Sequence, residues 1–253
     1  MNDSLKSGTL KKHFSAKKVI TTFDIRSFYQ RSEPGITEST LNWRIHNLVK
    51  TAILKRVSRG MFVFSDFIEF SQDLHKEDIA IYKKIHIKFP FTSVCVWNTR
   101  VFNHFTHNML FKYYTLVEVE RDAMRSVFYF LNEIKTRVVY NPTAEIMDLY
   151  AGVATNTIIV IPLISQAPLL DQNGVITPSI EKILVDIFCD PVIFASQQQD
   201  EMQNIFEGSF RNYNINLQSL LRYAGRRNKQ NEITAWMKKN PKLKPYMTSI
   251  VNK

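Results

Sequence analysis

The stretch that decides the fold runs from Thr37 to Phe64 and reads TESTLNWRIHNLVKTAILKRVSRGMFVF. Apolar residues in its first half follow the i, i+4, i+7, i+8 spacing of one helix face. The members of this apolar stripe are Leu41, Ile45, Leu48 and Val49. The second half holds two short apolar strands around a Ser-Arg-Gly turn. A helix followed at once by a basic hairpin is typical of a winged helix-turn-helix, and we expect that fold here.

A second, shorter helix is predicted just before this stretch. Thr21 offers an N-cap, and Asp24 follows three residues later as in a variant of the capping box. The segment 32–35 contains Pro and Gly and predicts a turn, after which Thr37 caps the next helix. Helix, turn, helix and hairpin together predict a DNA-binding domain over residues 1–70.

Residues 71–253 are expected to form a second domain, in which strand-like and helix-like segments alternate. The predicted strands are 91–97, 113–120, 136–140 and 157–161. A helix is predicted from Thr177 to Asp190, with Thr177 as its cap and Pro178 in its first turn. Two basic helices are expected over 215–227 and 230–239. The predicted fold class is α+β: a winged helix-turn-helix, then an α/β domain with a mixed sheet and a helical C-terminus.

Charge is distributed unevenly along the chain. Residues 1–60 carry 12 Lys or Arg against 4 acidic residues, residues 61–210 carry 11 against 18, and residues 211–253 carry 10 against one. Basic ends around an acidic middle indicate a polyanionic partner at one or both ends. The basic C-terminal block, which includes Arg222, Arg226 and Arg227, fits three roles equally well. It suits a second phosphate-contacting surface, a docking surface for an acidic protein, or an ordinary solvated face.

Composition argues against several classes of protein. The first 18 residues are polar and basic, unlike a signal peptide, and the apolar run 157–164 is far shorter than the roughly 20 residues of a membrane span. The two cysteines give no disulfide framework and no metal-ligand spacing. The chain has only seven glycines, which argues against a glycine-rich phosphate-binding loop. We therefore expect a cytoplasmic protein with no membrane partner, no metal and no cofactor.

The candidate DNA-contacting residues come from the helix and the hairpin. On a helical wheel, the side opposite the apolar stripe holds Ser39, Thr40, Trp43, His46, Asn47 and Lys50. Asn42 and Arg44 fall on the flanks, and the hairpin adds Arg56 and Arg59. Asparagine pairs bidentately with adenine, while Lys and Arg contact phosphates or enter the minor groove.

Two other interpretations of this helix remain open. A solvated face on a plain helical domain would account for the polar residues, but it explains an exposed Trp43 poorly. A protein-interaction adaptor would keep the winged helix and cover Trp43 and its neighbours with other parts of the chain.

An enzymatic alternative rests on Glu118 and Glu120, which are two residues apart on a predicted strand and so share a face. A nucleotidyltransferase or nuclease would need these two carboxylates around a metal with a third one. No phosphate-cradling turn precedes the strand. We expect instead polar positions at a sheet edge and a helix N-terminus, and we predict no catalytic residue.

Three stretches carry a resemblance to a known family. The first is 53–62; the second is 94–99 followed by 114–120; the third is 177–186 with 221–227. In order and spacing these stretches resemble the AbiEi family, the antitoxin and autoregulator of bacterial type IV toxin–antitoxin systems of the abortive-infection kind. The resemblance is to a divergent branch of that family, and the unusually basic N-terminal lead departs from the family pattern.

The resemblance implies a two-part repressor. The N-terminal winged helix would bind inverted repeats of double-stranded DNA in the operon's own promoter. The antitoxin-like C-terminal domain would counter a nucleotidyltransferase-like toxin functionally, without a stable complex. Only the DNA-reading role is carried onto residues of this chain, namely the helix and hairpin residues given above; no antitoxic surface is assigned.

Overall fold

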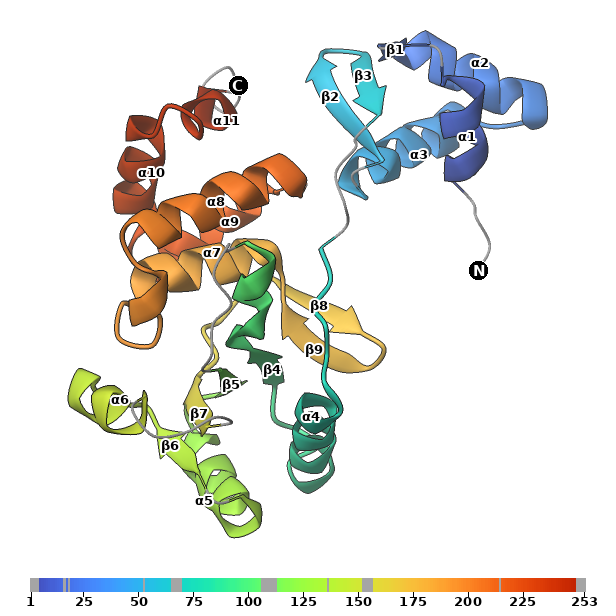
Figure 1. Ribbon diagram of the computed structural model, residues 1–253. Coiled ribbons are helices and arrows are strands. Elements are labelled where there is room, and N and C mark those ends of the chain that lie inside the picture. The colour runs from blue at the N-terminus through green and yellow to red at the C-terminus, as the bar shows by residue number, and fades with distance from the viewer. Residues whose placement is uncertain are drawn as a thin grey trace. The chain divides into compact units, whose positions relative to one another are not determined.

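The computed structural model describes residues 5–15, 17, 19–51, 53–64, 70–105, 113–135, 137–151, 157–213 and 215–248. The chain divides into two compact units (Figure 1). Unit 1 comprises residues 1–69 with 212–214, and unit 2 comprises residues 70–211 and 215–253.

The described residues of unit 1 form three helices and a three-stranded antiparallel sheet of order β1-β3-β2. Its elements are α1 (Ser7–His13), β1 (Ile20–Thr21), α2 (Thr22–Ser32), α3 (Glu38–Lys50), β2 (Leu54–Ser58) and β3 (Met61–Phe64). The predicted caps are confirmed: Thr21 and Asp24 form a reciprocal capping box on α2, and the Thr37 side chain accepts from the N–H of Thr40.

The apolar stripe of α3 forms part of the core of unit 1. Leu41, Ile45 and Leu48 are buried, and Val49 packs against the same cluster. This cluster also takes in Tyr29 of α2, so the two helices share one core. The predicted stripe is confirmed, and its burial fixes which side of α3 is left exposed.

The tip of the β2–β3 hairpin is tied to the start of α2. Gly60 has φ 75°, a left-handed conformation that glycine adopts without strain. Its carbonyl accepts hydrogen bonds from the N–H of Thr22 at 2.8 Å and from the Thr22 hydroxyl at 3.3 Å. The hairpin is therefore held in place at its tip as well as at its base.

In the described part of unit 2 there is a mixed four-stranded sheet and a helical C-terminal part, as predicted, together with a small hairpin that was not predicted. Its strands are β4 (Val94–Asn98), β5 (Tyr114–Val119), β6 (Val138–Tyr140), β7 (Thr157–Pro162), β8 (Leu169–Gln172) and β9 (Val175–Pro178). Its α-helices are α4 (Lys76–Lys88), α5 (Met124–Ile134), α6 (Ala144–Ala151), α7 (Ile180–Cys189), α8 (Asp200–Asn212), α9 (Leu217–Arg226), α10 (Gln230–Lys239) and α11 (Lys244–Thr248). Two 3₁₀ turns lie at Thr99–His104 and Ala195–Gln197.

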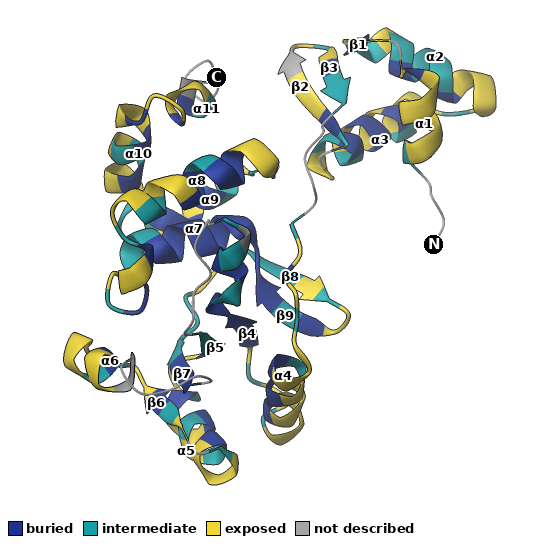
Figure 2. Ribbon diagram, viewed as in Figure 1, coloured by how far each residue is buried: buried dark blue, intermediate teal, exposed yellow. Residues whose placement is uncertain are grey.

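The sheet has the order β4-β5-β7-β6, with β4 antiparallel to β5 and the other two pairs parallel. Side chains alternate between its faces. Val117 and Val119 belong to the cluster that includes α4 and α5, so these helices cover one face. Glu118 points to the other face, where it meets α7. Figure 2 shows α7 buried along nearly its whole length.

The predicted start of α7 is wrong. Thr177 and Pro178 end β9, and the helix begins at Ile180 after Ser179 at the N-cap position. The preceding segment forms the β8–β9 hairpin, whose turn residues Asn173 and Gly174 have φ 55° and 81°. Positive φ at both central residues is the conformation that Asn-Gly favours in two-residue hairpins.

Candidate nucleic-acid interface

The side of α3 opposite the apolar stripe is largely open to solvent. Trp43 is 53% exposed, an unusual state for a large aromatic side chain. Ser39, Asn42, His46 and Lys50 are also exposed, whereas Thr40 and Asn47 are half-buried. Six of the eight candidate DNA-contacting residues on α3 therefore lie on one accessible side of the helix or at the border of that side, and Trp43 is at its centre. Asn42, the seventh, flanks them.

Hydrogen bonds within α3 orient several of these side chains. The Asn47 side-chain amide donates to the main-chain carbonyl of Trp43 at 2.9 Å. One amide hydrogen and the side-chain oxygen of Asn47 stay available, which is what a bidentate contact to adenine needs. At the N-terminus of α3, the hydroxyls of Ser39 and Thr40 lie 3.0 and 2.9 Å from the Thr37 hydroxyl.

Arg44 does not belong to this exposed side, which corrects its prediction as a DNA contact. It is 9% exposed, its guanidinium lies 4.7 Å from the centroid of the Tyr29 ring, and its Nη2 is 2.8 Å from Glu33. Arg44 follows Leu41 by three residues and so borders the apolar stripe. Its long apolar stem continues that stripe while its charge finds a carboxylate.

The hairpin presents two cations to solvent. Arg56 and Arg59 are both exposed. The Arg56 guanidinium lies 5.5 Å from the ring centroid of Phe62 on the neighbouring strand, a cation–π contact that orients it. Arg59 lies next to Gly60 at the tip.

Within the described part of unit 1, the acidic residues do not neutralise the cations of this surface. Over the described residues 5–64 there are three acids, and each is already ion-paired: Asp24 with Lys17, Glu33 with Arg44 and Lys6, and Glu38 with Arg26. The Arg44 guanidinium and then Lys6 lower the pKa of Glu33 to about 2, so it is a carboxylate at neutral pH. Lys50, Arg56 and Arg59 therefore contribute unneutralised positive charge.

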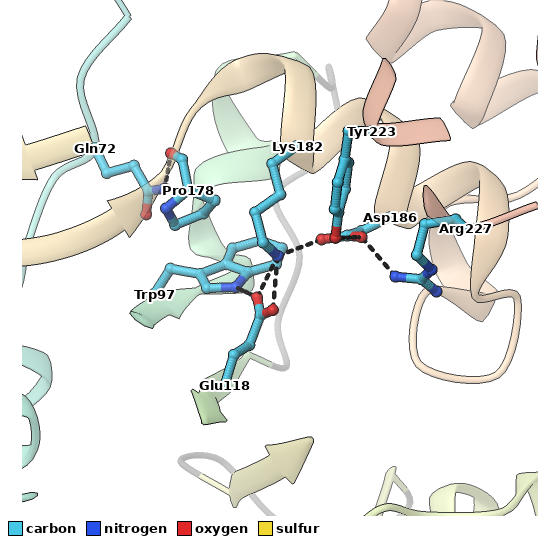
Figure 3. Close-up of polar contacts among 8 residues, drawn as sticks. All are labelled: Gln72, Trp97, Glu118, Pro178, Lys182, Asp186, Tyr223 and Arg227. Atoms are coloured by element: carbon cyan, nitrogen blue, oxygen red, sulfur yellow. Dashed lines mark hydrogen bonds and ion pairs between the residues drawn. The ribbon is translucent and has the colours of Figure 1, made fainter. Parts of the chain in front are cut away.

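Glu118 and Glu120 bond to different partners and do not share a site, and Figure 3 shows Glu118 beside Trp97 and Lys182. Glu118 is 2% exposed; it accepts from Trp97 Nε1 at 2.7 Å and from Lys182 Nζ at 2.6 Å. Glu120 is exposed beyond the end of β5 and accepts from the Ser93 hydroxyl at 2.5 Å. The expectation of a sheet-edge position is also wrong for Glu118, because β5 is an interior strand.

Glu118 instead belongs to a buried charge cluster that sequence reasoning missed. Lys182 is fully buried and also contacts Asp186 at 2.5 Å. Asp186 in turn accepts from Tyr223 at 2.9 Å and from Arg227 at 2.7 Å. The sequence signal was present: Lys182 and Asp186 stand four apart, on one side of an otherwise apolar helix.

Two carboxylates and two cations balance one another in this cluster. Burial alone would lower the pKa of Lys182, but Asp186 and Glu118 raise it well above its ordinary value, so the lysine is charged. Burial, and then the nearby Asp186, raise the pKa of Tyr223. The phenol therefore stays protonated and donates to Asp186. Because the cluster joins β5, α7 and α9 and is buried apart from the edge of Arg227, it acts as a structural clamp.

Arg227 is corrected by the same geometry. All three roles considered for the basic C-terminal block place Arg227 at the surface, yet its side chain is only 21% exposed and is paired with Asp186. Arg222 and Arg226 remain exposed.

Within the described ranges, no group of three or more His, Cys, Asp or Glu side chains lies close enough to hold a metal ion. Across the same ranges, no helix is both long and apolar enough to cross a bilayer.

Comparison with known proteins places the chain in a family. No curated protein matches it. A model described as a family of unknown function (DUF6577) matches residues 40–242, about four-fifths of the chain, from within α3 to just beyond α10. The chain therefore belongs to the family of unknown function DUF6577.

Proposed function

We propose that unit 1 is a winged helix-turn-helix domain and that the protein is a DNA-binding transcriptional regulator. The observation that carries the proposal is the exposed side of α3, with Trp43 more than half exposed and Lys50 about two helical turns further along. Contact with a partner would cover the apolar surface of Trp43, which a solvated helix face leaves in water.

The α3 helix would enter the major groove, which is wide enough for one α-helix. Asn47, held by its bond to the Trp43 carbonyl, would read a base edge. Ser39, Thr40, Asn42 and His46 would contact bases or phosphates around it, and Lys50 would neutralise a phosphate.

The β2–β3 hairpin would act as the wing. Arg56 and Arg59 would lie against the backbone or in the minor groove. The bonds between Gly60 and Thr22 support this role, since a wing held at its tip loses little conformational freedom on binding.

We further propose that this regulator is the autorepressing antitoxin of an AbiE-like type IV toxin–antitoxin system and acts in the cytoplasm. The support is the sequence resemblance in 53–62, 94–99, 114–120, 177–186 and 221–227. Its operator would be inverted repeats in its own promoter, and its toxin a nucleotidyltransferase-like enzyme countered without a stable complex.

A mobility-shift titration on the DNA upstream of the gene, beside scrambled DNA of equal length, tests the proposal. We expect tighter binding to the upstream DNA and a steep loss of affinity with salt, because bound Lys and Arg release counterions. Equal, weak binding to both DNAs would contradict base reading, and no binding at low salt would contradict DNA binding altogether. Co-expression with the product of the adjacent gene tests the antitoxin part; unrelieved toxicity would contradict it.

A further inference from the structure

A groove between α1 and α2 of unit 1 combines aromatic side chains with a cationic rim. Its volume is about 280 Å³. Phe14 and Phe28 line it, and His13, Lys17 and Arg31 supply basic groups. Ligand pockets in proteins start at roughly 300 Å³, so a groove of this size suits a molecule with a single ring.

The aromatic lining is well packed. The His13 ring lies 4.6 Å from the Phe14 ring centroid, edge-on at 84°, and 5.3 Å from that of Phe28. Phe14 and Phe28 are 6.0 Å apart. Phe23 also lines the groove but is 74% exposed, which leaves a phenyl ring in water with little in the molecule to cover it. Three packed rings and one open ring form a surface suited to a flat apolar body.

The charged side chains of the groove favour a ligand that carries a negative charge. Among the described residues that line the groove, Asp24 is the one acidic side chain, and it is already engaged by Lys17 at 2.7 Å and by the N–H of Thr21 at 2.9 Å. Arg31 is exposed and forms no ion pair with any described residue. The groove therefore offers an unneutralised guanidinium, which prefers carboxylate, sulfonate or phosphate oxygens.

We propose that this groove binds a small planar anion: an aromatic ring stacked among Phe23, Phe28 and His13, with its anionic group on Arg31. The site is separate from the proposed DNA-reading side of α3. Arg26, on the other side of α2, pairs with Glu38 at the start of α3, so the groove and α3 flank α2 on different sides. The inference goes beyond the proposed function and does not depend on it.

Titration of the full chain with phenyl phosphate, followed by calorimetry or NMR, tests the site. Inorganic phosphate and benzyl alcohol serve as probes that carry only the anion or only the ring. We expect saturable binding of phenyl phosphate, at least about tenfold tighter than either half-probe, because both halves of the site contribute. Absence of saturable binding, or equal affinity for benzyl alcohol, would overturn the proposal.

Two variants and a matched control locate the bound probe. Arg31→Gln should weaken phenyl phosphate about tenfold, the effect of losing one charge-assisted hydrogen bond. Arg26→Gln removes the same charge from the other side of α2 and should leave affinity unchanged. Phe23→Ala should weaken phenyl phosphate but not inorganic phosphate. Equal losses in both arginine variants would show diffuse attraction and overturn the site. The titration contains no DNA, so its outcome is independent of DNA binding.

Discussion

Arg44 of α3 and Glu33, which follows α2, form an ion pair of 2.8 Å beside the Tyr29 ring. The Nε and Nη1 atoms of Arg44 are buried without a hydrogen-bond partner among the described residues. The pair thus joins the two helices of the proposed helix-turn-helix while leaving part of a guanidinium unsatisfied. Replacing Glu33 and replacing Arg44 should therefore change the stability of unit 1 by different amounts.

Glu33→Gln should lower the thermal midpoint of unit 1 more than Arg44→Met does. The first change leaves a buried cation without its counterion, whereas the second removes the charge and keeps an apolar stem over Tyr29. Differential scanning calorimetry of both variants and of the double variant checks this. A larger loss for Arg44→Met would show that the unsatisfied guanidinium atoms carry no cost.

The pH dependence of unit 1 follows from the same pair. Arg44 and then Lys6 lower the pKa of Glu33 from 4.5 to about 2. Because the folded-state pKa is the lower one, the pair stabilises fully above pH 4.5, and this contribution is lost as pH falls toward about 2. Thermal midpoints measured across this window should fall less steeply in Glu33→Gln than in the wild type. An equal fall of the thermal midpoint with pH in the variant and the wild type would contradict the assignment of this pH dependence to Glu33.

Lys182→Met should destabilise unit 2 by about 3–5 kcal/mol, because it leaves Glu118 and Asp186 buried without their shared cation. Lys229→Met is the matched control. Lys229 pairs with Glu232 at the surface, where an ion pair contributes about 0–1 kcal/mol. Urea unfolding of both variants gives the comparison. Similar losses of unfolding free energy in the two variants would contradict a clamp role for Lys182.

The candidate DNA contacts divide into two kinds with different signatures. Lys50→Ala and Arg59→Ala should weaken binding to every DNA sequence and reduce the salt slope by about one unit each, since each removes a phosphate contact. Asn47→Ala should instead remove about 1–3 kcal/mol of preference at one base position. Affinities for upstream and scrambled DNA at several salt concentrations separate the two. Equal loss on every sequence for all three variants would contradict base reading.

The elements of unit 1 could be predicted from the sequence because their signals are local. Thr21 and Thr37 each accept from an N–H group three residues away, and the α3 stripe repeats within 13 residues. The burial of Arg44 could not be predicted in this way. Its position borders the stripe, and its partner Glu33 is 11 residues away across a turn.

Prediction was poorer in unit 2, where distant contacts decide the structure. The strand predicted over 157–161 is observed as β7 (Thr157–Pro162), because a continuous apolar stretch suits a doubly covered sheet. Asn173-Gly174 is a strong hairpin signal, yet the flanking strands lack alternation and the hairpin was overlooked. The i, i+4 spacing of Lys182 and Asp186 is a local signal for that pair, but Glu118 lies 64 residues from Lys182, and no local pattern reveals this third member.

The most direct test of DNA recognition by α3 compares two exposed aromatic side chains. Trp43 on α3 is 53% exposed, and Tyr129 on α5 of unit 2 is 64% exposed. Trp43→Glu and Tyr129→Glu add the same charge to different surfaces. Fluorescence anisotropy with labelled upstream DNA should show that binding is lost in Trp43→Glu and retained in Tyr129→Glu. Wild-type affinity in Trp43→Glu would contradict the proposal that α3 reads DNA.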